Sequence, residues 1–397
     1  MSNGSKQPEN VMSKWEWMKL KDICEKGSSN IKQSDLKDLT GDYPIFGASG
    51  YIQNVDFYQR DRDYIGIIKD GSGVGRTMLL PAFSSVIGTL QYILPKEGND
   101  IKFINYALQN IDFSKSVQGA AIPHIYFKDY GETEILVPPL SEQKRIVKFL
   151  DEEFSKIETL KTNAETNLKN AKELFETTLE KELNPGKNGA LPSGWEWKTL
   201  QEICRKIVDG THNSPPNKAK GDYQYITAKN IKADGIDLSD VTYVSKEVHK
   251  EIFARCNPEK GDVLLIKDGA TTGIAVINTL DYEFSLLSSV ALIKVDKTKI
   301  YEKTLVYLLN SKAIYKQMRK KMDGAAITRL TLEKIKALQI PLPPLPVQKE
   351  IVARLDKLSE NVKRLEANYK QIIANCDELK KSILKKTFEG DSRSSRE

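Results

Sequence analysis

The sequence contains few of the residues that build metal sites and disulfide frameworks. Its 397 residues include four cysteines and three histidines. Metal sites and disulfide scaffolds need closely spaced or evenly patterned ligands, and no CxxC pair or Cys/His cluster is present. We therefore expect no metal site and a reduced compartment. Cys24 and Cys204 occupy matching places in WEWMKLKDIC and WEWKTLQEIC, which indicates core cysteines.

Long apolar runs are also missing. No stretch of roughly 18 apolar residues occurs, which is the length that a membrane-spanning helix needs. The first residues, MSNGSKQPENVMS, are polar and unlike a signal peptide. We expect a cytoplasmic protein with no membrane association.

Motifs for catalysis are weak. The stretch DGSGVG (70–75) has the glycines of a phosphate loop, but no Lys-Ser/Thr pair follows, and the matching GATTG (269–273) does not keep the pattern. The VPPL and LPPL stretches lack the Asp/Asn-Pro-Pro-aromatic order that adenine methyltransferases share. We expect no catalytic residue in this chain.

An internal repeat is the strongest feature of the sequence. Residues 119–151 read GAAIPHIYFKDYGETEILVPPLSEQKRIVKFLD, and residues 324–356 read GAAITRLTLEKIKALQIPLPPLPVQKEIVARLD. WEW, IKDG and GAAI recur in the same order, with offsets of 180 (Trp15 to Trp195), 198 (Ile68 to Ile266) and 205 (Gly119 to Gly324). Such self-similarity indicates two copies of one domain, the second enlarged by insertions.

Each copy mixes strand and helix patterns. DYIGIIKDG, SSVIGTLQYILP, DVLLIKDG and SSVALIKV are typical of strands that end at Gly, Asp or Pro, whereas IKFINYALQNI and YEKTLVYLLNSKAIYKQMRKKM have helical spacing. Each copy is therefore predicted to be an α/β (α+β) domain.

A long helix is predicted after each Pro-Pro pair, from about Ser141 to Glu182 and from about Pro346 to Phe388. Both carry apolar residues at heptad spacing. The short linker between the first helix and the second domain lets the two helices pack only in opposite directions, which predicts an antiparallel two-helix coiled coil. The predicted seam residues are Leu150, Phe154, Ile157, Leu168, Phe175, Leu355, Leu358, Val362, Leu365, Ile372 and Leu379.

These features together resemble the specificity subunit of type I restriction-modification systems. The resemblance rests on the PPLxxQ junctions, the LPxGWEW re-entry, and VDGTHNSPP (208–216), GDYQYITAKNIK (221–232) and GDVLLIKDGATTG (261–273). The first copy departs from this pattern, because it has no GTH stretch and carries GDYPIFGASGYI instead.

The resemblance implies a division of the chain into two target-recognition domains and a spacer. The predicted segments are an N-terminal tail (1–13), target-recognition domain 1 (14–138), spacer helix 1 (139–184), a linker (185–194), target-recognition domain 2 (195–343), spacer helix 2 (344–388) and a polar C-terminal tail (389–397).

The resemblance also implies the partners. Each domain would read one half of a bipartite, asymmetric site in double-stranded DNA, and the coiled coil would set the gap and dock two methyltransferase subunits. Two restriction/translocase subunits would add DNA cleavage. S-adenosylmethionine, and ATP with Mg²⁺ for restriction, would be bound by those partners and not by this chain.

Candidate DNA contacts follow from the residue types that read base edges and phosphates. Residues 14–138 hold 14 basic and 16 acidic side chains, a net charge of −2, whereas residues 194–343 hold 24 and 18, a net charge of +6. Domain 1 must therefore rely on a local cationic strip. Its candidates are Lys69, Ser72, Arg76, Gln91, Lys115, Gln118, His124 and Lys128. The candidates in domain 2 are Lys229, Asn230, Lys267, Thr271, Thr272, Arg319, Lys320, Lys321 and Arg329.

Two other functions remain open from the sequence. The chain could be a self-contained nuclease with a target-recognition region, or a structural adaptor that bridges proteins through its coiled coil without binding DNA. Catalysis by the purified chain would favour the first, and the absence of any selected DNA motif would favour the second.

Overall fold

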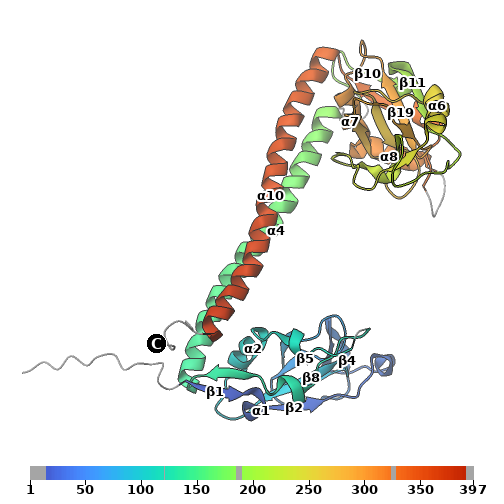
Figure 1. Ribbon diagram of the computed structural model, residues 1–397. Coiled ribbons are helices and arrows are strands. Elements are labelled where there is room, and N and C mark those ends of the chain that lie inside the picture. The colour runs from blue at the N-terminus through green and yellow to red at the C-terminus, as the bar shows by residue number, and fades with distance from the viewer. Residues whose placement is uncertain (1–14, 120, 185–189, 323–327, 390–397) are drawn as a thin grey trace, which may run out of the picture. The chain divides into compact units, whose positions relative to one another are not determined.

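The computed structural model describes residues 15–119, 121–184, 190–322 and 328–389. The chain forms two compact units, Met1–Glu165 with Gln371–Glu397, and Thr166–Lys370. Each unit contains one α/β head together with one end of each long helix, α4 (Leu140–Leu183) and α10 (Leu345–Glu389) (Figure 1). The predicted tail 1–13, and parts of the predicted linker and C-terminal tail, lie outside the described residues.

Head 1 contains two sheets and one main helix. The first sheet is antiparallel with strand order β2-β8-β5-β6, and the second has the order β4-β3-β7, in which β3 and β7 are parallel. Helix α2 (Ile101–Gln109) packs on the first sheet (Figure 1). The strands are β2 (Cys24–Ser28), β3 (Tyr43–Gly47), β4 (Gly50–Val55), β5 (Tyr64–Ile68), β6 (Thr77–Leu80), β7 (Ser85–Val86) and β8 (Leu90–Pro95). Short helices are α1 (Leu20–Ile23), η2 (Gln33–Leu36), η3 (Phe113–Ser116) and α3 (Phe127–Tyr130).

Head 2 repeats this topology. Its sheets have the orders β11-β19-β16-β17 and β15-β12-β18, and β12 and β18 are again parallel. The strands are β11 (Cys204–Asp209), β12 (Tyr223–Ile226), β15 (Thr242–Val244), β16 (Val263–Ile266), β17 (Ala275–Ile277), β18 (Ser285–Leu286) and β19 (Val290–Val295). The helices are α5 (Leu200–Ile203), η4 (Ala228–Asn230), α6 (Lys246–Arg255), α7 (Glu302–Leu309), α8 (Lys312–Lys321) and α9 (Leu332–Lys336). The small hairpin β13 (Ile231–Lys232)–β14 (Gly235–Ile236) and α6 account for much of the larger size.

The central strands are buried on both faces, which explains their continuous apolar sequences. All of β5 and all of β16 are buried. One face of β16 packs with α7, α9 and the ends of the long helices, and the other packs against the second sheet. Burial raises the pKa of Cys24, Cys204 and Cys256 to about 12. Of the two cysteines predicted to lie in the core, Cys24 is buried, and Cys204 is half-buried and packs against the core of head 2.

A two-stranded ribbon and a buried glutamine join each head to its long helix. The ribbons are β1 (Glu16–Lys19) with β9 (Glu134–Val137), and β10 (Glu196–Thr199) with β20 (Gln339–Leu342). Gln143 accepts a hydrogen bond from the Asp100 N–H (2.8 Å) and donates to the Pro138 carbonyl (2.9 Å). The repeated glutamine of the sequence is therefore the residue that fixes the first turn of the long helix against the head.

The second junction is bonded in the same way. Gln348 accepts from the Tyr301 N–H (2.9 Å) and donates to the carbonyl oxygens of Lys299 (3.0 Å) and Pro343 (2.8 Å). About two turns further along α10, Asp356 accepts from Lys303 Nζ (2.6 Å) and from the Tyr307 hydroxyl (2.7 Å). The hydrogen bond to Asp356 raises the pKa of Lys303.

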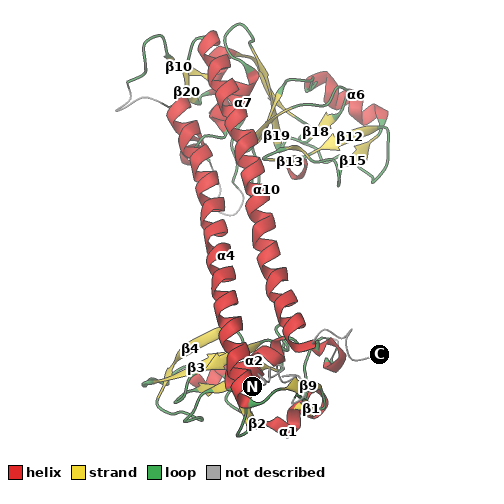
Figure 2. Ribbon diagram, turned by 90° about the vertical axis from the view of Figure 1, so that its left-hand side faces the viewer, coloured by secondary structure: helices red, strands yellow, loops and turns green. Residues whose placement is uncertain are grey.

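Within each unit, α4 and α10 lie side by side and run in opposite directions (Figure 2). In the first unit, Lys161 pairs with Asp377 (2.7 Å) and Glu158 pairs with Lys380 (2.6 Å). The hydrogen bond between Lys161 and Asp377 raises the pKa of the lysine and lowers that of the carboxyl. The antiparallel coiled coil predicted from the sequence is confirmed.

On α10, the predicted seam is correct for the row that contains Leu355 and Val362. It is wrong for part of the second row, which contains Leu358, Leu365, Ile372 and Leu379. Leu355 and Val362 are buried, and Leu358 and Ile372 are half-buried, but Leu365 and Leu379 are 37% and 47% exposed. The neighbouring side chains Glu366 and Lys380 are less exposed than these leucines. The seam of α10 therefore follows Leu355 and Val362 together with the positions one residue after Leu365 and Leu379, and not these two leucines themselves.

The predicted seam of α4 is correct. Leu150 and Ile157 are buried, whereas Phe154, Leu168 and Phe175 are half-buried. Lys161 fills the seam position, and the adjacent Leu160 is exposed. Ion pairs at Lys161 and Lys380 let charged side chains occupy the edge of the seam, because each finds an opposite charge on the facing helix.

Candidate nucleic-acid interface

In head 1, the loop after β5 meets the segment that follows the GAAI sequence. The Ile125 N–H donates to the Lys69 carbonyl (2.9 Å), and the Gly71 N–H donates to the Pro123 carbonyl (2.9 Å). His124 thereby lies in an isolated β-bridge with Asp70. We call the loop 69–76 with the segment 122–128 edge 1.

Head 2 forms the equivalent structure with the same register. The Leu330 N–H donates to the Lys267 carbonyl (2.8 Å), and the Gly269 N–H donates to the Thr328 carbonyl (3.0 Å). The loop 267–273 with the segment 328–331 is edge 2. Arg329 forms the β-bridge with Asp268, so it occupies the place that His124 has in head 1. The backbone is repeated while the side chain that it presents differs.

A glycine near the end of each loop lets an aromatic ring from a neighbouring helix pack directly against the loop backbone. Gly75 has φ +87°, and a Cβ there would lie 2.7 Å from the Phe113 ring on η3. Gly273 has φ +106°, and a Cβ there would lie 2.9 Å from the Tyr315 ring on α8. Both the positive φ and the close ring select glycine. This packing brings the basic end of α8 beside edge 2.

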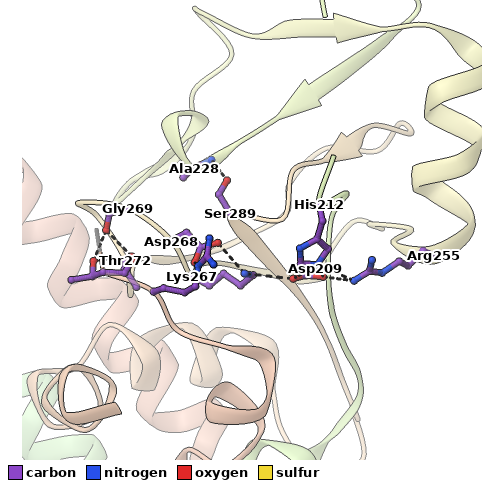
Figure 3. A network of polar contacts seen from close by, with 11 residues as sticks. Asp209, His212, Ala228, Arg255, Lys267, Asp268, Gly269, Thr272 and Ser289 are labelled. Carbon is purple, nitrogen blue, oxygen red and sulfur yellow. Dashed lines mark hydrogen bonds and ion pairs between the residues drawn. The ribbon is translucent and has the colours of Figure 1, made fainter. Parts of the chain in front are cut away.

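Edge 2 is supported by a network of charged side chains around Asp209 at the end of β11 (Figure 3). The Asp209 carboxylate pairs with Arg255 (2.6 Å), His212 (3.2 Å) and Lys267 (3.5 Å). Lys267 also pairs with Asp268 (2.9 Å). The network connects β11, α6 and the loop after β16.

Most of the candidates in head 1 gather at edge 1 and at η3 beside it. Ser72 and Arg76 are exposed on the loop, and Lys128 is exposed at the end of the segment, whereas Lys69 and His124 are half-buried. The exposed Lys115 lies on η3, and the exposed Gln118 forms a β-bridge with His124. Lys69 pairs with Asp70 (3.0 Å), and Gln118 donates to Asp129 (3.0 Å). Most residues of the predicted local strip thus lie on edge 1 and η3, and their contact with DNA stays a prediction.

The candidates in head 2 divide between the surface and the interior. Thr271, Arg329, Arg319 and Lys320 are exposed, and Lys321 is half-buried at the end of α8. Lys229 is exposed on η4 and pairs with Asp240 (2.8 Å). Edge 2 and the end of α8 therefore hold most of the accessible candidates.

Four candidates are buried and bonded within the chain. Gln91 accepts from the Tyr130 hydroxyl (2.7 Å), and Asn230 accepts from the Thr227 N–H (3.0 Å). The Thr272 hydroxyl donates to the Gly269 carbonyl (2.7 Å), and Lys267 lies between two carboxylates. Sequence patterns cannot separate a polar residue that holds a loop from one that projects from it, and we assign these four to holding the loops.

Two exposed groups beside edge 2 were not predicted from the sequence. Arg255 ends α6, and His212 belongs to the GTH stretch; both bind the Asp209 carboxylate. The signal for His212 was its place in VDGTHNSPP. No sequence signal pointed to Arg255, because it is 46 residues from Asp209 along the chain and only folding brings the two together.

Two heads of one fold, each with an equivalent edge and a different set of exposed polar side chains, define a two-domain binding protein. A family model for the type I restriction modification DNA specificity domain matches the chain twice, at residues 12–170 and 192–374. The chain belongs to this family.

Individual relatives support the assignment. The type I restriction enzyme MjaVIII specificity subunit of Methanocaldococcus jannaschii is 23% identical over 98% of this chain and 95% of its own length. A chain from a structure described as "Structural basis underlying complex assembly and conformational transition of the type I R-M system" has the same fold, with a TM-score of 0.73 and 20% identity over 97% of this chain and 100% of that one. The HsdS subunit from Thermoanaerobacter tengcongensis gives a TM-score of 0.55 at 19% identity over 97% and 99% of the two chains.

Within the described ranges, no helix has both the length and the apolar character needed to cross a membrane.

Proposed function

We propose that this chain is the DNA specificity subunit of a type I restriction-modification complex. Each head reads one half of a bipartite site, and the two halves differ in sequence. The observation that carries the proposal is the equivalence of edges 1 and 2, which share backbone hydrogen bonds but present His124 in one head and Arg329 in the other. Membership of the specificity-domain family supports it.

The partners of such a chain supply the chemistry. Two methyltransferase subunits, docked on the helix pair, would bind S-adenosylmethionine, and restriction/translocase subunits would use ATP and Mg²⁺. This chain contributes binding and no catalytic residue of its own. The complex would act on DNA in the cytoplasm.

The mechanism rests on the chemistry that the edges present. Arginine can donate two parallel hydrogen bonds to guanine O6 and N7 in the major groove, whereas a neutral imidazole has one donor and one acceptor nitrogen and cannot donate such a pair. The lysines and arginines on η3 and α8 are suited to phosphate oxygens, which position each head without reading sequence. Because edge 1 lies in a head with a net charge of −2, its phosphate contacts must come from this strip.

Replacing Arg329 by alanine in the assembled complex is expected to relax base preference in one half-site only. The loss of one bidentate contact is worth about 1–3 kcal/mol of discrimination. His124→Ala should relax the other half-site. Binding to a panel of duplexes, each with one base pair changed, measures both effects.

A matched control is Lys297→Ala. Lys297 is exposed in the connection after β19, at the end of the sheet opposite to edge 2. It should leave the base preference of both half-sites unchanged. A finding that Arg329→Ala weakens binding equally to every duplex would assign Arg329 to phosphate contact and contradict its role in reading bases.

A further inference from the structure

Five charged side chains in head 2 form a chain of alternating sign. Arg255 Nη2 lies 2.6 Å from Asp209 Oδ1, and Asp209 Oδ2 lies 3.5 Å from Lys267 Nζ. Lys267 Nζ lies 2.9 Å from Asp268 Oδ2, and Asp268 Oδ1 lies 3.1 Å from Arg329 Nε. The chain joins α6 to edge 2 through groups on β11 and on the loop after β16.

The middle of this chain is enclosed and its ends are exposed. The side chains of Asp209 and Lys267 are 2% and 6% exposed, whereas those of Arg255 and Arg329 are 52% and 67% exposed. An enclosed charge holds its partners firmly, because no water can replace them. The two guanidinium groups are therefore tethered at fixed points on either side of Asp209 and Lys267 (Figure 3 shows the Arg255 side).

Head 1 has the same fold without this series of five charged side chains. Asp209 pairs with Ala291 in the sheet, and the equivalent register position in head 1, opposite Gln91, is Ser28. His124 takes the place of Arg329. The ion pair between Lys69 and Asp70 (3.0 Å) in head 1 corresponds to that between Lys267 and Asp268 in head 2. The extended chain is thus a property of head 2 and not of the shared architecture.

We propose that Asp209 is a positioning residue that sets where Arg255 and Arg329 meet the second half-site, and that Arg255 is a DNA contact of head 2. The inference rests on the proposed function of the head. Arginine held by a carboxylate keeps free N–H groups for bases or phosphates, since the guanidinium carries five donors. Asp209 Oδ1 and His212 Nε2 lie 2.6 and 3.3 Å from Nη2 of Arg255, and no described hydrogen bond involves its Nε or Nη1, which are left to the ligand.

The test is Asp209→Asn in the full complex with its methyltransferase partners. The amide keeps the shape of the side chain but has no charge to hold Arg255 and Lys267 together. Discrimination between the preferred base and its alternatives is expected to fall about tenfold or more at one or more positions of the second half-site. The first half-site serves as an internal control and should keep its full discrimination.

Asp262→Asn is the matched control for a loss of stability. Asp262 pairs with Lys294 (2.8 Å) at the other end of β16, away from edge 2. It should lower stability without changing the order of base preference. The proposal is overturned if Asp209→Asn keeps full discrimination at every position of the second half-site, or if both variants weaken binding to all duplexes equally.

Arg255→Gln keeps the test decisive if Asp209→Asn does not fold. Arg255 is the exposed last member of the series of ion pairs, so its loss leaves Asp209, Lys267 and Asp268 paired with one another. It should change affinity for the second half-site and leave the first unchanged; unchanged binding to both would overturn the proposal. If the unaltered complex selects no bipartite site at all, the proposed function fails, and that result is distinct from a failure of this inference.

Discussion

Insertion of one heptad into each long helix is expected to change the gap between the two half-sites by about three base pairs and to leave both half-site sequences unchanged. Seven helical residues add about 10 Å at 1.5 Å per residue, and base pairs rise about 3.4 Å each. A full heptad keeps the seam in phase, since the same positions face the partner helix again.

The insertions belong after residue 166 in α4 and after residue 370 in α10. The ion pairs Lys161–Asp377 and Arg354–Glu182 show that these places lie at matched levels of the antiparallel helices. Selection of bound duplexes from a randomised pool gives the gap and both half-sites in one experiment. A four-residue insertion in each helix is the control, because it rotates the seam and should impair assembly. An unchanged gap after the heptad insertion would contradict the spacer role of the helices.

Replacing Gln348 by leucine is expected to lower the free energy of unfolding by about 3–5 kcal/mol, because each buried polar group left without a partner costs about 1–3 kcal/mol. Gln348 is fully buried and bonds the backbone of Lys299, Tyr301 and Pro343. The leucine would leave one N–H and two carbonyl groups without their partner. Urea denaturation followed by tryptophan fluorescence measures the effect, since Trp195 packs against the same core.

Two other glutamines calibrate this prediction. Gln143→Leu removes one N–H and one carbonyl partner in head 1 and should cost somewhat less. Gln371→Leu lies on the exposed surface of α10, where the side chain bonds only Asn375 among the described hydrogen bonds, and should change stability little. Equal effects at Gln348 and Gln371 would show that the junction glutamine does not fix the helix to the head.

The repeat in the sequence predicted two copies of one domain, and the heptad spacing with the short linker predicted the antiparallel helices. The KDG loop and the junction glutamine recur because each serves a backbone arrangement that both heads share. The second GAAI sequence, 324–327, lies outside the described residues. The offsets of 198 and 205 converge in space, so that Gly71 with Pro123 and Gly269 with Thr328 form the same hydrogen bond. The order of the repeated motifs predicted two copies of one domain, and the contact between the two segments of each edge was found only in the structure.

The phase of the seam could not be predicted in the same way. Leu365 and Leu379 continue the apolar heptad of α10, whereas the neighbouring positions that are less exposed in the structure hold Glu366 and Lys380. The choice was made by facing residues on α4, including the pairing of Glu158 with Lys380. The spacing of apolar residues predicts that a seam exists. Which residues form it depends on the side chains of the partner helix.

Polar loop residues were also beyond sequence reasoning. Lys267 looked like a cation available to DNA, yet two carboxylates from β11 and its own loop enclose it. Arg255 lay in an insertion with no counterpart in head 1 and was overlooked. Burial of a charged group depends on contacts far apart in sequence, so only the folded structure shows which cations remain accessible.

Selection from a randomised duplex pool by the chain assembled with its methyltransferase partners tests the central claim most directly. The account predicts one bipartite motif whose two halves differ in sequence and are separated by a gap of fixed length, with His124→Ala relaxing one half and Arg329→Ala the other. A single continuous motif, two identical halves, or no motif at all would contradict it.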